Sequence, residues 1–251
     1  MKTLDFDYVI VGGGAAGCVL AARLAADSGT RVALLERGRR DDNRWIHVPA
    51  TFFKALQSQD AEAVVSEPDD SLGGLPFPVP QGRVLGGGSS VNGMIYMRGQ
   101  AQDYDDWAED HGCAGWSYAD VLPVFRRQEA NRRISNEFHG TEGRLVVDDP
   151  SAPHPICIRL IEAAVATGVP RTDDFNGAAQ EGAGWYQVTA SDGQRQSAAH
   201  CFLKPEMGRE NLTVLTGHMA YRIRIERRRA VAVEAKDAGG GEVLLRAARE
   251  I

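Results

Sequence analysis

The sequence lacks the residue patterns that mark several classes of protein. Its four cysteines lie far apart and form no C-x-x-C pair, so neither a disulfide framework nor a zinc site is expected. Its six histidines show no H-x-H or H-E-x-x-H spacing, which leaves a metal centre without support. The chain also has no apolar run long enough to span a bilayer and no basic N-terminal region typical of a signal peptide. These absences favour a cytoplasmic protein with reduced thiols and no membrane span.

Positive charge is also in short supply. Lysine and arginine total 28 against 34 aspartates and glutamates, which gives a net charge of −6. An acidic chain offers no general electrostatic footprint for nucleic acid or anionic lipid. Glycine, by contrast, is abundant, with 28 residues, and it is clustered.

A βαβ unit is predicted at the start of the chain. Residues 8–11 form a continuous apolar run, as a strand buried on both faces requires. An alanine- and leucine-rich segment at residues 15–27 predicts a helix, and residues 31–36 predict a second strand. The crossover between two such strands is expected to be right-handed.

The turn of this unit carries a dinucleotide-binding fingerprint. Gly12 allows a tight turn, Gly14 lets the backbone approach a pyrophosphate, and Gly17 lets the helix pack close to the strand. Glu36, at the end of the second strand, is placed to accept hydrogen bonds from ribose hydroxyls and to repel a 2′-phosphate, which argues against NADP. The fingerprint alone does not choose between FAD and NAD.

A second glycine cluster lies within residues 82–99. Its sequence Gly86-Gly-Gly-Ser-Ser90 is a loop with exposed amides and two hydroxyls that could approach a large flat cofactor. A flexible surface loop is the alternative interpretation. The apolar residues Val84, Leu85 and Val91 on either side argue against a solvated loop, but the residues alone leave the two interpretations even.

These segments resemble the glucose–methanol–choline (GMC) oxidoreductases, FAD enzymes that oxidise alcohols. The resemblance includes residues 82–99 followed by Asp105, and it continues in the family's order through Asp174-Phe-Asn-Gly177 and residues 211–216. The bacterial choline-dehydrogenase-like members are the most similar. The resemblance implies an FAD-dependent oxidoreductase that acts on the CH–OH group of a small alcohol and passes hydride to flavin N5.

The resemblance also implies roles for individual residues. The three fingerprint glycines would hold the FAD pyrophosphate, Glu36 the adenosine ribose, Val84 and residues 92–95 the flavin, and the Ala220 backbone the adenine. Val91 stands where some members carry a histidine linked to FAD, so non-covalent FAD is expected. The expected cofactor-binding residues are Gly12, Gly14, Ala15, Ala16, Gly17, Glu36, Arg37, Val84, Gly87, Ser89, Asn92, Gly93, Met94, Ile95 and Ala220.

No catalytic residue is assigned. The family's catalytic histidine lies near the C-terminus of longer members, and none of the six histidines here occupies that motif. The chain is therefore expected to be an inactive N-terminal portion, and residues 246–251 read as a strand that has just begun. A non-catalytic nucleotide-binding remnant and an NAD-dependent dehydrogenase are the alternatives. The particular alcohol, the electron acceptor and the oligomeric state cannot be read from the sequence.

The expected fold class is α/β, with a Rossmann-like FAD-binding domain around a parallel sheet, part of an α+β substrate domain and a small β-meander, in a truncated chain. Residues 1–150 are assigned to the FAD-binding domain with an irregular excursion at 38–82, residues 151–205 to the substrate domain, and residues 206–251 to a return to the first domain. Further helices are expected at residues 104–109, 118–129 and 155–167, and strands at residues 212–216, 221–226, 230–235 and 242–246.

Overall fold

A computed structural model describes residues 2–251, and these residues divide into two compact units. Unit 1 contains the residues up to Gly93 and those from Ser197 to Ile251, and unit 2 contains Met94–Gln196. These boundaries differ from the expected divisions at residues 150 and 205. The difference arises because residues before 150 pair with residues after it, as in the bridges that Ile95 and Asp148 form with Val188.

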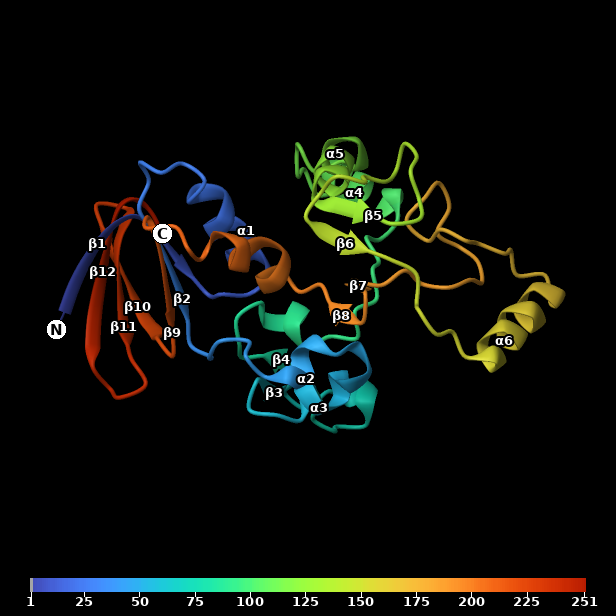
Figure 1. Cartoon of the computed structure of the whole chain (residues 1–251), viewed down its shortest axis with the longest axis horizontal. Coiled ribbons are helices and arrows are strands. Elements are labelled where there is room, and N and C mark those ends of the chain that lie inside the picture. The colour runs from blue at the N-terminus through green and yellow to red at the C-terminus, as the bar shows by residue number, and fades with distance from the viewer. Residues whose placement is uncertain (1) are drawn as a thin grey trace. The chain divides into compact units, whose positions relative to one another are not determined.

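Unit 1 is built on a six-stranded mixed sheet with the strand order β10-β11-β12-β1-β2-β9 (Figure 1). The elements of unit 1 are β1 (Lys2–Val11), α1 (Ala15–Leu24), β2 (Val32–Glu36), α2 (Arg44–His47), α3 (Phe52–Leu56), β3 (Ala61–Val65), β4 (Pro78–Gly82), β9 (Leu212–Thr216), β10 (Met219–Glu226), β11 (Arg229–Lys236) and β12 (Glu242–Glu250). Short 3-10 and π-helical turns join them, including one at Gly87–Ser90 and one at Ala199–Leu203.

The predicted βαβ unit is present. Strands β1 and β2 pair in parallel from Tyr8 with Val32 to Val11 with Leu35, and β9 continues the parallel arrangement beyond β2. All five residues of β2 are buried. In residues 8–11, which were expected to be buried on both faces, only Val9 is buried and Val11 is 46% exposed. Helix α1 ends at Leu24, three residues earlier than expected.

Strand β1 is longer than the sequence indicated. It begins at Lys2, where the chain pairs in parallel with β12 through Lys2 and Val243. The sequence did not predict this part of the strand, because its residues are largely polar. Its partner, β12, lies at the far end of the sequence. The expectation that a new strand begins near residue 246 is wrong: residues 246–250 continue β12 and pair with β1.

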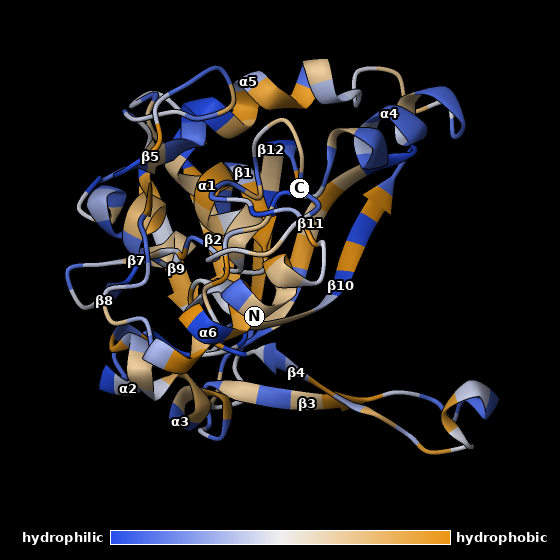
Figure 2. Cartoon of the chain, turned by 90° about the vertical axis from the view of Figure 1, so that its right-hand side faces the viewer, coloured by the Kyte–Doolittle hydropathy of each residue, from blue (hydrophilic) through white to orange (hydrophobic). Residues whose placement is uncertain are grey.

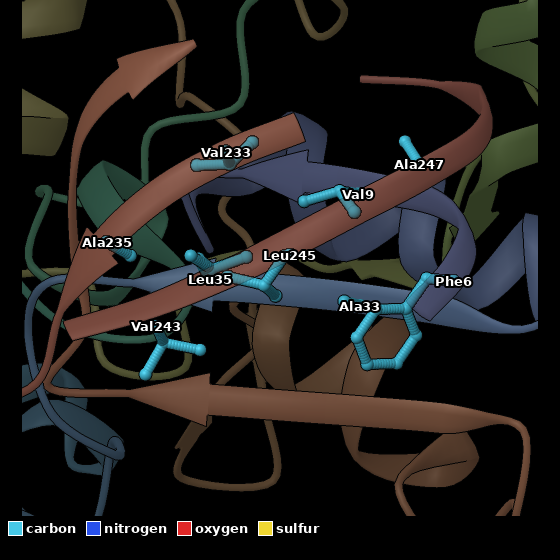
Figure 3. Close-up of a cluster of buried hydrophobic side chains, with 9 residues drawn as sticks. All are labelled: Phe6, Val9, Ala33, Leu35, Val233, Ala235, Val243, Leu245 and Ala247. Carbon is cyan, nitrogen blue, oxygen red and sulfur yellow. The ribbon is translucent and has the colours of Figure 1, made fainter. Parts of the chain in front are cut away.

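The main core of unit 1 lies on one face of this curved sheet. Phe6 and Val9 of β1 pack with Ala33 and Leu35 of β2 and with residues of β11 and β12 (Figure 3). The remaining members of the cluster are Val233, Ala235, Val243, Leu245 and Ala247. A shared core of this kind fixes the sheet on which the glycine turn is mounted.

The expected irregular excursion at residues 38–82 contains regular structure. Helices α2 and α3 are followed by an antiparallel hairpin of β3 and β4, whose connection extends outward to a 3-10 turn (Figure 2). The sequence missed this hairpin because β4 contains Pro78 and Pro80. Proline cannot donate to a ladder, so it is compatible only with an edge strand, and a two-stranded hairpin consists of edges alone.

Unit 2 has short elements and a polar interior. Its elements are α4 (Ala101–Glu109), α5 (Tyr118–Gln128), β5 (Glu129–Asn131), β6 (Leu145–Val147), α6 (Pro155–Ala166), β7 (Ala190–Ser191) and β8 (Gln194–Arg195). The three helices lie within two residues of their expected ends, apart from the start of α4. Helix α5 begins with a capping box, in which Ser117 accepts from the Asp120 N–H and the Asp120 carboxylate accepts from the Ser117 N–H.

Candidate functional site

The first glycine loop, residues 12–17, joins the end of β1 to α1. Gly12 has a φ of +98°, a conformation that L side chains rarely adopt. A Cβ atom on Gly17 would lie 2.0 Å from the Gly12 carbonyl oxygen. The close approach of helix to strand that the fingerprint predicts is therefore present, and it leaves no room for a side chain at residue 17.

The start of α1 is open to a ligand. A Cβ on Gly14 would meet nothing within 4 Å, and Ala15 and Ala16 are exposed. Gly14 is the N-cap of the helix, and no side chain there accepts a hydrogen bond from the first-turn amides. Free N–H groups and the positive end of the helix dipole together favour an anionic group such as a pyrophosphate.

Glu36 lies beside this turn, and each oxygen of its carboxylate accepts one backbone hydrogen bond. Its Oε2 accepts from the Gly13 N–H at 2.8 Å, and its Oε1 accepts from the Gly38 N–H at 2.7 Å. An ionised carboxylate has about four acceptor positions, so each oxygen retains room for one ribose hydroxyl. Glu36 thus fixes the loop around it.

The second glycine loop, residues 86–90, lies directly against the first. The Gly86 N–H donates to the Gly13 carbonyl oxygen at 2.7 Å. A Cβ on Gly87, whose φ is +53°, would lie 2.8 Å from the Gly14 Cα. Two glycine clusters about seventy residues apart in the sequence therefore form one backbone surface, which the sequence suggested only through family resemblance.

The serines of the second loop are used to fix its shape. The Ser89 hydroxyl donates to the Gly86 carbonyl and accepts from the Ala198 N–H at 3.0 Å. The Ser90 hydroxyl is buried and donates to the Leu85 carbonyl at 2.7 Å. The loop thus offers a ligand mainly backbone groups, and Gly88 at its centre is exposed.

The residues expected to line the flavin fall into two groups. Val84 is fully buried and packs with Ile46, Ala55 and Val91, so neither its side chain nor its backbone is exposed to a cofactor. Residues 92, 93 and 95 are exposed, and Met94 is buried with a φ of +64°. A left-handed conformation at a non-glycine residue is strained, and such strain is concentrated at functional sites.

The far end of the candidate site lies at the carboxyl ends of β2 and β9. The His218 N–H donates to the Glu36 carbonyl at 3.0 Å, which brings the start of β10 and Ala220 beside Glu36. A cleft of about 710 Å³ opens here, lined by Arg40, Trp45 and Thr216 among others. The expected binding residue Arg37 is exposed and forms an ion pair with Glu62 at 3.0 Å.

Sequence reasoning missed several residues of this site. Gly13 and Gly38 supply the amides that hold Glu36, and a Cβ on Gly38 would lie 2.1 Å from the Arg83 carbonyl oxygen. Gly38 directly follows Glu36-Arg37, and a glycine at this position is the sequence signal that could have identified it as part of the site. The cleft residue Trp45 gave no signal, because α2 is too short to be recognised from periodicity.

No imidazole among residues 2–251 bonds to either glycine loop. His47 contacts the Asp41 carbonyl, His218 contacts the Thr216 carbonyl, and His139 lies between two carboxylates of unit 2. The same residues contain no cluster of histidine, cysteine, aspartate and glutamate that could hold a metal ion. Across residues 2–251, no helix combines the length and apolar character needed to cross a membrane.

A parallel strand pair, a glycine turn, an open helix N-terminus and an acid at the end of β2 define a dinucleotide-binding unit of the Rossmann type. The ribose acid, the pyrophosphate amides and the second backbone loop fit FAD. Residues 6–251 match the family model described as GMC oxidoreductase, and the chain belongs to this family. The cofactor of the family is FAD, which decides against the NAD alternative.

Two curated relatives illustrate the similarity. The oxygen-dependent choline dehydrogenase of Brucella anthropi is 39% identical over 99% of this chain and 45% of its own length. The alcohol dehydrogenase [acceptor] of Pseudomonas putida is also 39% identical, over 96% of this chain and 45% of its own length. The chain thus spans less than half the length of the curated relatives it matches.

Solved structures agree on the fold. Pyridoxine 4-oxidase from Mesorbium loti superimposes with a TM-score of 0.90 at 32% identity, over 96% of this chain and 48% of that one. A formate oxidase superimposes with a TM-score of 0.87 at 25% identity, over 99% of this chain and 45% of that one. The α/β fold class and the family expected from the sequence are therefore confirmed.

Proposed function

We propose that this chain is the FAD-binding portion of an oxidoreductase that acts on the CH–OH group of a small alcohol. When bound, FAD supplies the hydride acceptor for the carbinol carbon. The residues of this chain bind and orient the cofactor, through the first glycine loop at the pyrophosphate, Glu36 at the ribose and residues 92–95 beside the flavin. The names of the curated relatives, choline dehydrogenase and alcohol dehydrogenase, support an alcohol substrate.

The observation that carries the proposal is the contact between the two glycine loops. The Gly86 N–H donates to the Gly13 carbonyl, and the Gly87 Cα region approaches Gly14 more closely than any side chain would permit. This contact extends the pyrophosphate turn of an ordinary dinucleotide unit by a second backbone surface. A dinucleotide cofactor can use both surfaces, and the family match identifies it as FAD.

The proposal includes that these 251 residues alone do not turn over alcohols. Alcohol oxidation needs a base within hydrogen-bond reach of the substrate hydroxyl. The His139 imidazole is enclosed between Glu129 and Asp174, and no imidazole of residues 2–251 bonds to the glycine loops. We therefore assign the chain cofactor binding and no catalytic base.

Titration of the purified chain with FAD tests the proposal. Binding should change the flavin absorption and fluorescence, and NAD or NADP in excess should not displace the flavin. The matched variants are Gly14→Ala, which places a methyl group where the pyrophosphate would approach, and Gly88→Ala, which also has open space within 4 Å. Gly14→Ala should weaken FAD binding at least about ten-fold, equal to about 1.4 kcal/mol, and Gly88→Ala should weaken it less. Absence of FAD binding by the wild-type chain would contradict the proposal.

Two further measurements separate the parts of the proposal. Acid denaturation should release all flavin into solution, because Val91 has no nucleophilic atom and its side chain is buried with Val84. Flavin retained on the precipitate would contradict non-covalent binding. An assay with excess FAD, an artificial acceptor and a panel of alcohols should show no reduction, and substrate-dependent reduction would place a base within this chain.

A further inference from the structure

A closed ring of hydrogen bonds lies in unit 2, and all of its members are buried except Asp174, whose side chain is 23% exposed. The Arg98 guanidinium donates to Glu129, which accepts from His139 Nδ1 at 3.0 Å. His139 Nε2 faces Asp174 Oδ2 at 3.0 Å, and Asp174 Oδ1 accepts from the Asn176 N–H at 3.0 Å. The Asn176 side-chain oxygen then accepts from the Arg98 N–H at 2.8 Å, which closes the ring. We call these five residues the buried ring.

The geometry of the buried ring favours a doubly protonated His139, whose Nδ1 lies 3.0 Å from Glu129 and 3.2 Å from the Asn131 amide nitrogen. Each of its ring nitrogens faces a carboxylate, and an ionised carboxylate only accepts hydrogen bonds. A neutral imidazole has one N–H, so it would turn a lone pair toward either Glu129 or Asp174. Burial lowers the pKa of His139, but the hydrogen bonds to Asp174 and Glu129 outweigh burial and raise that pKa to about 9.

The buried ring holds one particular segment of backbone, residues 94–98. The Asn176 side chain accepts from the Arg98 N–H and donates to the Tyr96 carbonyl at 3.1 Å. The other end of the segment is held by Thr189, whose N–H and hydroxyl both donate to the Met94 carbonyl. These bonds keep Met94 in its left-handed conformation with φ of +64°. Relaxation of the strain there would otherwise change the direction of the chain.

We propose that the buried ring is the positioning device for residues 94–98, the segment that continues the flavin-lining stretch, and that it works only while His139 donates from both nitrogens. This inference rests on the proposed function for its consequence at the cofactor. His139 joins the two arms that reach the segment: Glu129 orients the Arg98 side chain, and Asp174 orients Asn176, which binds the backbone on both sides of Met97. His139 is thus a positioning residue that touches neither the cofactor nor the substrate.

The groups around His139 determine the pH dependence. Glu129 of β5 and Asp174 of the loop after α6 face its two nitrogens, and Arg98 lies beyond Glu129. From α5, Arg126 donates to the His139 carbonyl rather than to its ring. A raised pKa means that the stabilisation is complete below the unfolded value of 6.5 and is lost as pH rises through about 9. The segment should therefore loosen between pH 6.5 and pH 9.

Amide hydrogen exchange of the full chain, without FAD, tests the inference directly. Two amides report on the ring: Arg98 N–H, which donates to Asn176, and Tyr96 N–H, which donates to the Gln187 carbonyl at 2.9 Å. Their protection factors, corrected for intrinsic exchange, should fall at least about ten-fold between neutral pH and pH 9, since one pKa unit corresponds to a ten-fold change. The Val188 N–H, which donates to Asp148 outside the ring, should change less and serves as the internal reference.

Three variants sharpen the test. His139→Gln cannot donate to both carboxylates, so it should lower protection at Tyr96 and Arg98 already at neutral pH and remove the pH dependence. Asp174→Asn keeps the shape but removes one carboxylate, so the midpoint of the pH profile should move to lower pH. His111→Gln, at an exposed histidine of the same unit, should match the wild type.

The outcomes separate this inference from the proposed function. Unchanged protection at Tyr96 and Arg98 in His139→Gln, or equal loss at Val188, would overturn the positioning role whether or not FAD binds. If His139→Gln fails to fold, the inference is tested by the pH profile of amide protection in the wild type and by the midpoint of that profile in Asp174→Asn. A midpoint that does not shift in Asp174→Asn would overturn the inference. A wild-type chain that shows the exchange profile but binds no FAD would contradict the proposed function alone. Where FAD binds, its dissociation constant should rise at least about ten-fold in His139→Gln.

Discussion

At the carboxyl ends of β1 and β2, the chain brings backbone against backbone, and side chains are excluded. The Gly17 and Gly87 positions have no room for a Cβ atom, and the contacts are made by amides and carbonyls. In unit 2 the opposite holds: Arg98, Glu129 and His139 are buried charged side chains that contact each other. The first region is therefore sensitive to added atoms, and the second is sensitive to lost charge.

The difference has a physical reason. A dinucleotide needs close approach to amides, and any side chain on the loop would occupy the space of the ligand. The buried ring instead fixes a strained backbone segment, which calls for strong directional bonds in a medium of low dielectric constant. Buried charges supply such bonds provided that every partner is present. The predictions below run from the largest expected effect to the smallest.

Removing one charge from the buried ring should have the largest effect. Glu129→Gln leaves Arg98 and His139 facing an amide in a fully buried site, and breaking a buried pair costs about 3 to 5 kcal/mol. Denaturant unfolding at neutral pH measures the loss. The matched control is Glu142→Gln, at an exposed position in the same unit, which should change the free energy of unfolding by less than about 0.5 kcal/mol. Equal effects of the two variants would contradict the importance of the ring.

Adding one methyl group to the first glycine loop should come next. Gly17→Ala places a Cβ 2.0 Å from the Gly12 carbonyl oxygen, and overpacking of this kind costs about 1 to 3 kcal/mol. Gly14→Ala meets nothing within 4 Å and should cost less than about 1 kcal/mol as an N-cap change. Thermal unfolding without FAD should separate the two variants. If both unfold alike, the backbone contact is not what holds the loop.

Lowering the pH should gradually reduce the free energy of unfolding of unit 2. Burial raises the pKa of Glu129, but hydrogen bonds from His139, Asn131 and Gly140 together with Arg98 hold it below its usual range of 4.5. A lowered pKa contributes stability above the unfolded value, and that stability is lost as pH falls through the folded value. Unfolding free energy should thus decline below about pH 4.5, and the decline should be shallower in Glu129→Gln. A wild-type profile that stays flat in acid would contradict this interpretation.

The smallest effect should come from an exposed ion pair. Arg159 and Glu162 of α6 lie one turn apart at 2.9 Å, with side chains 81% and 50% exposed. Solvent screens such pairs, so Arg159→Ala should change the free energy of unfolding by less than about 0.5 kcal/mol. Denaturant unfolding is again the measurement. A loss comparable to that of Glu129→Gln would show that burial is not what distinguishes the ring.

Much of unit 1 could be predicted from local sequence. The strand at Leu212–Thr216 has the expected ends, and the fingerprint residues occupy a strand, a turn and a helix as expected. These signals are local, because periodicity and glycine placement within a few residues report backbone geometry. The hairpin of β3 and β4 was missed for the opposite reason, since Pro78 and Pro80 argue against a strand until its partner is known.

The buried ring could not be predicted at all. Arg98 and Asp174 lie in segments that carry the family resemblance, but no role was predicted for them or for Glu129, and His139 was set aside with the other histidines. Charged residues are rarely buried, so nothing short of the tertiary structure would place them inside. The same holds for the boundaries of the two units, which follow bridges between distant residues such as Ile95 and Val188.

The sequence by itself determined the class of cofactor site, because glycine spacing after a buried strand limits what the backbone there can do and which ligand can approach it. It also predicted that Glu36 ends the second strand beside the glycine turn, where the structure places it. The tertiary structure decided what holds these parts in place: the contact of Gly86 with Gly13, the amides of Gly13 and Gly38 on Glu36, and the charges paired around His139. Such contacts join residues far apart in the chain, and their energies depend on burial, which the order of residues does not specify.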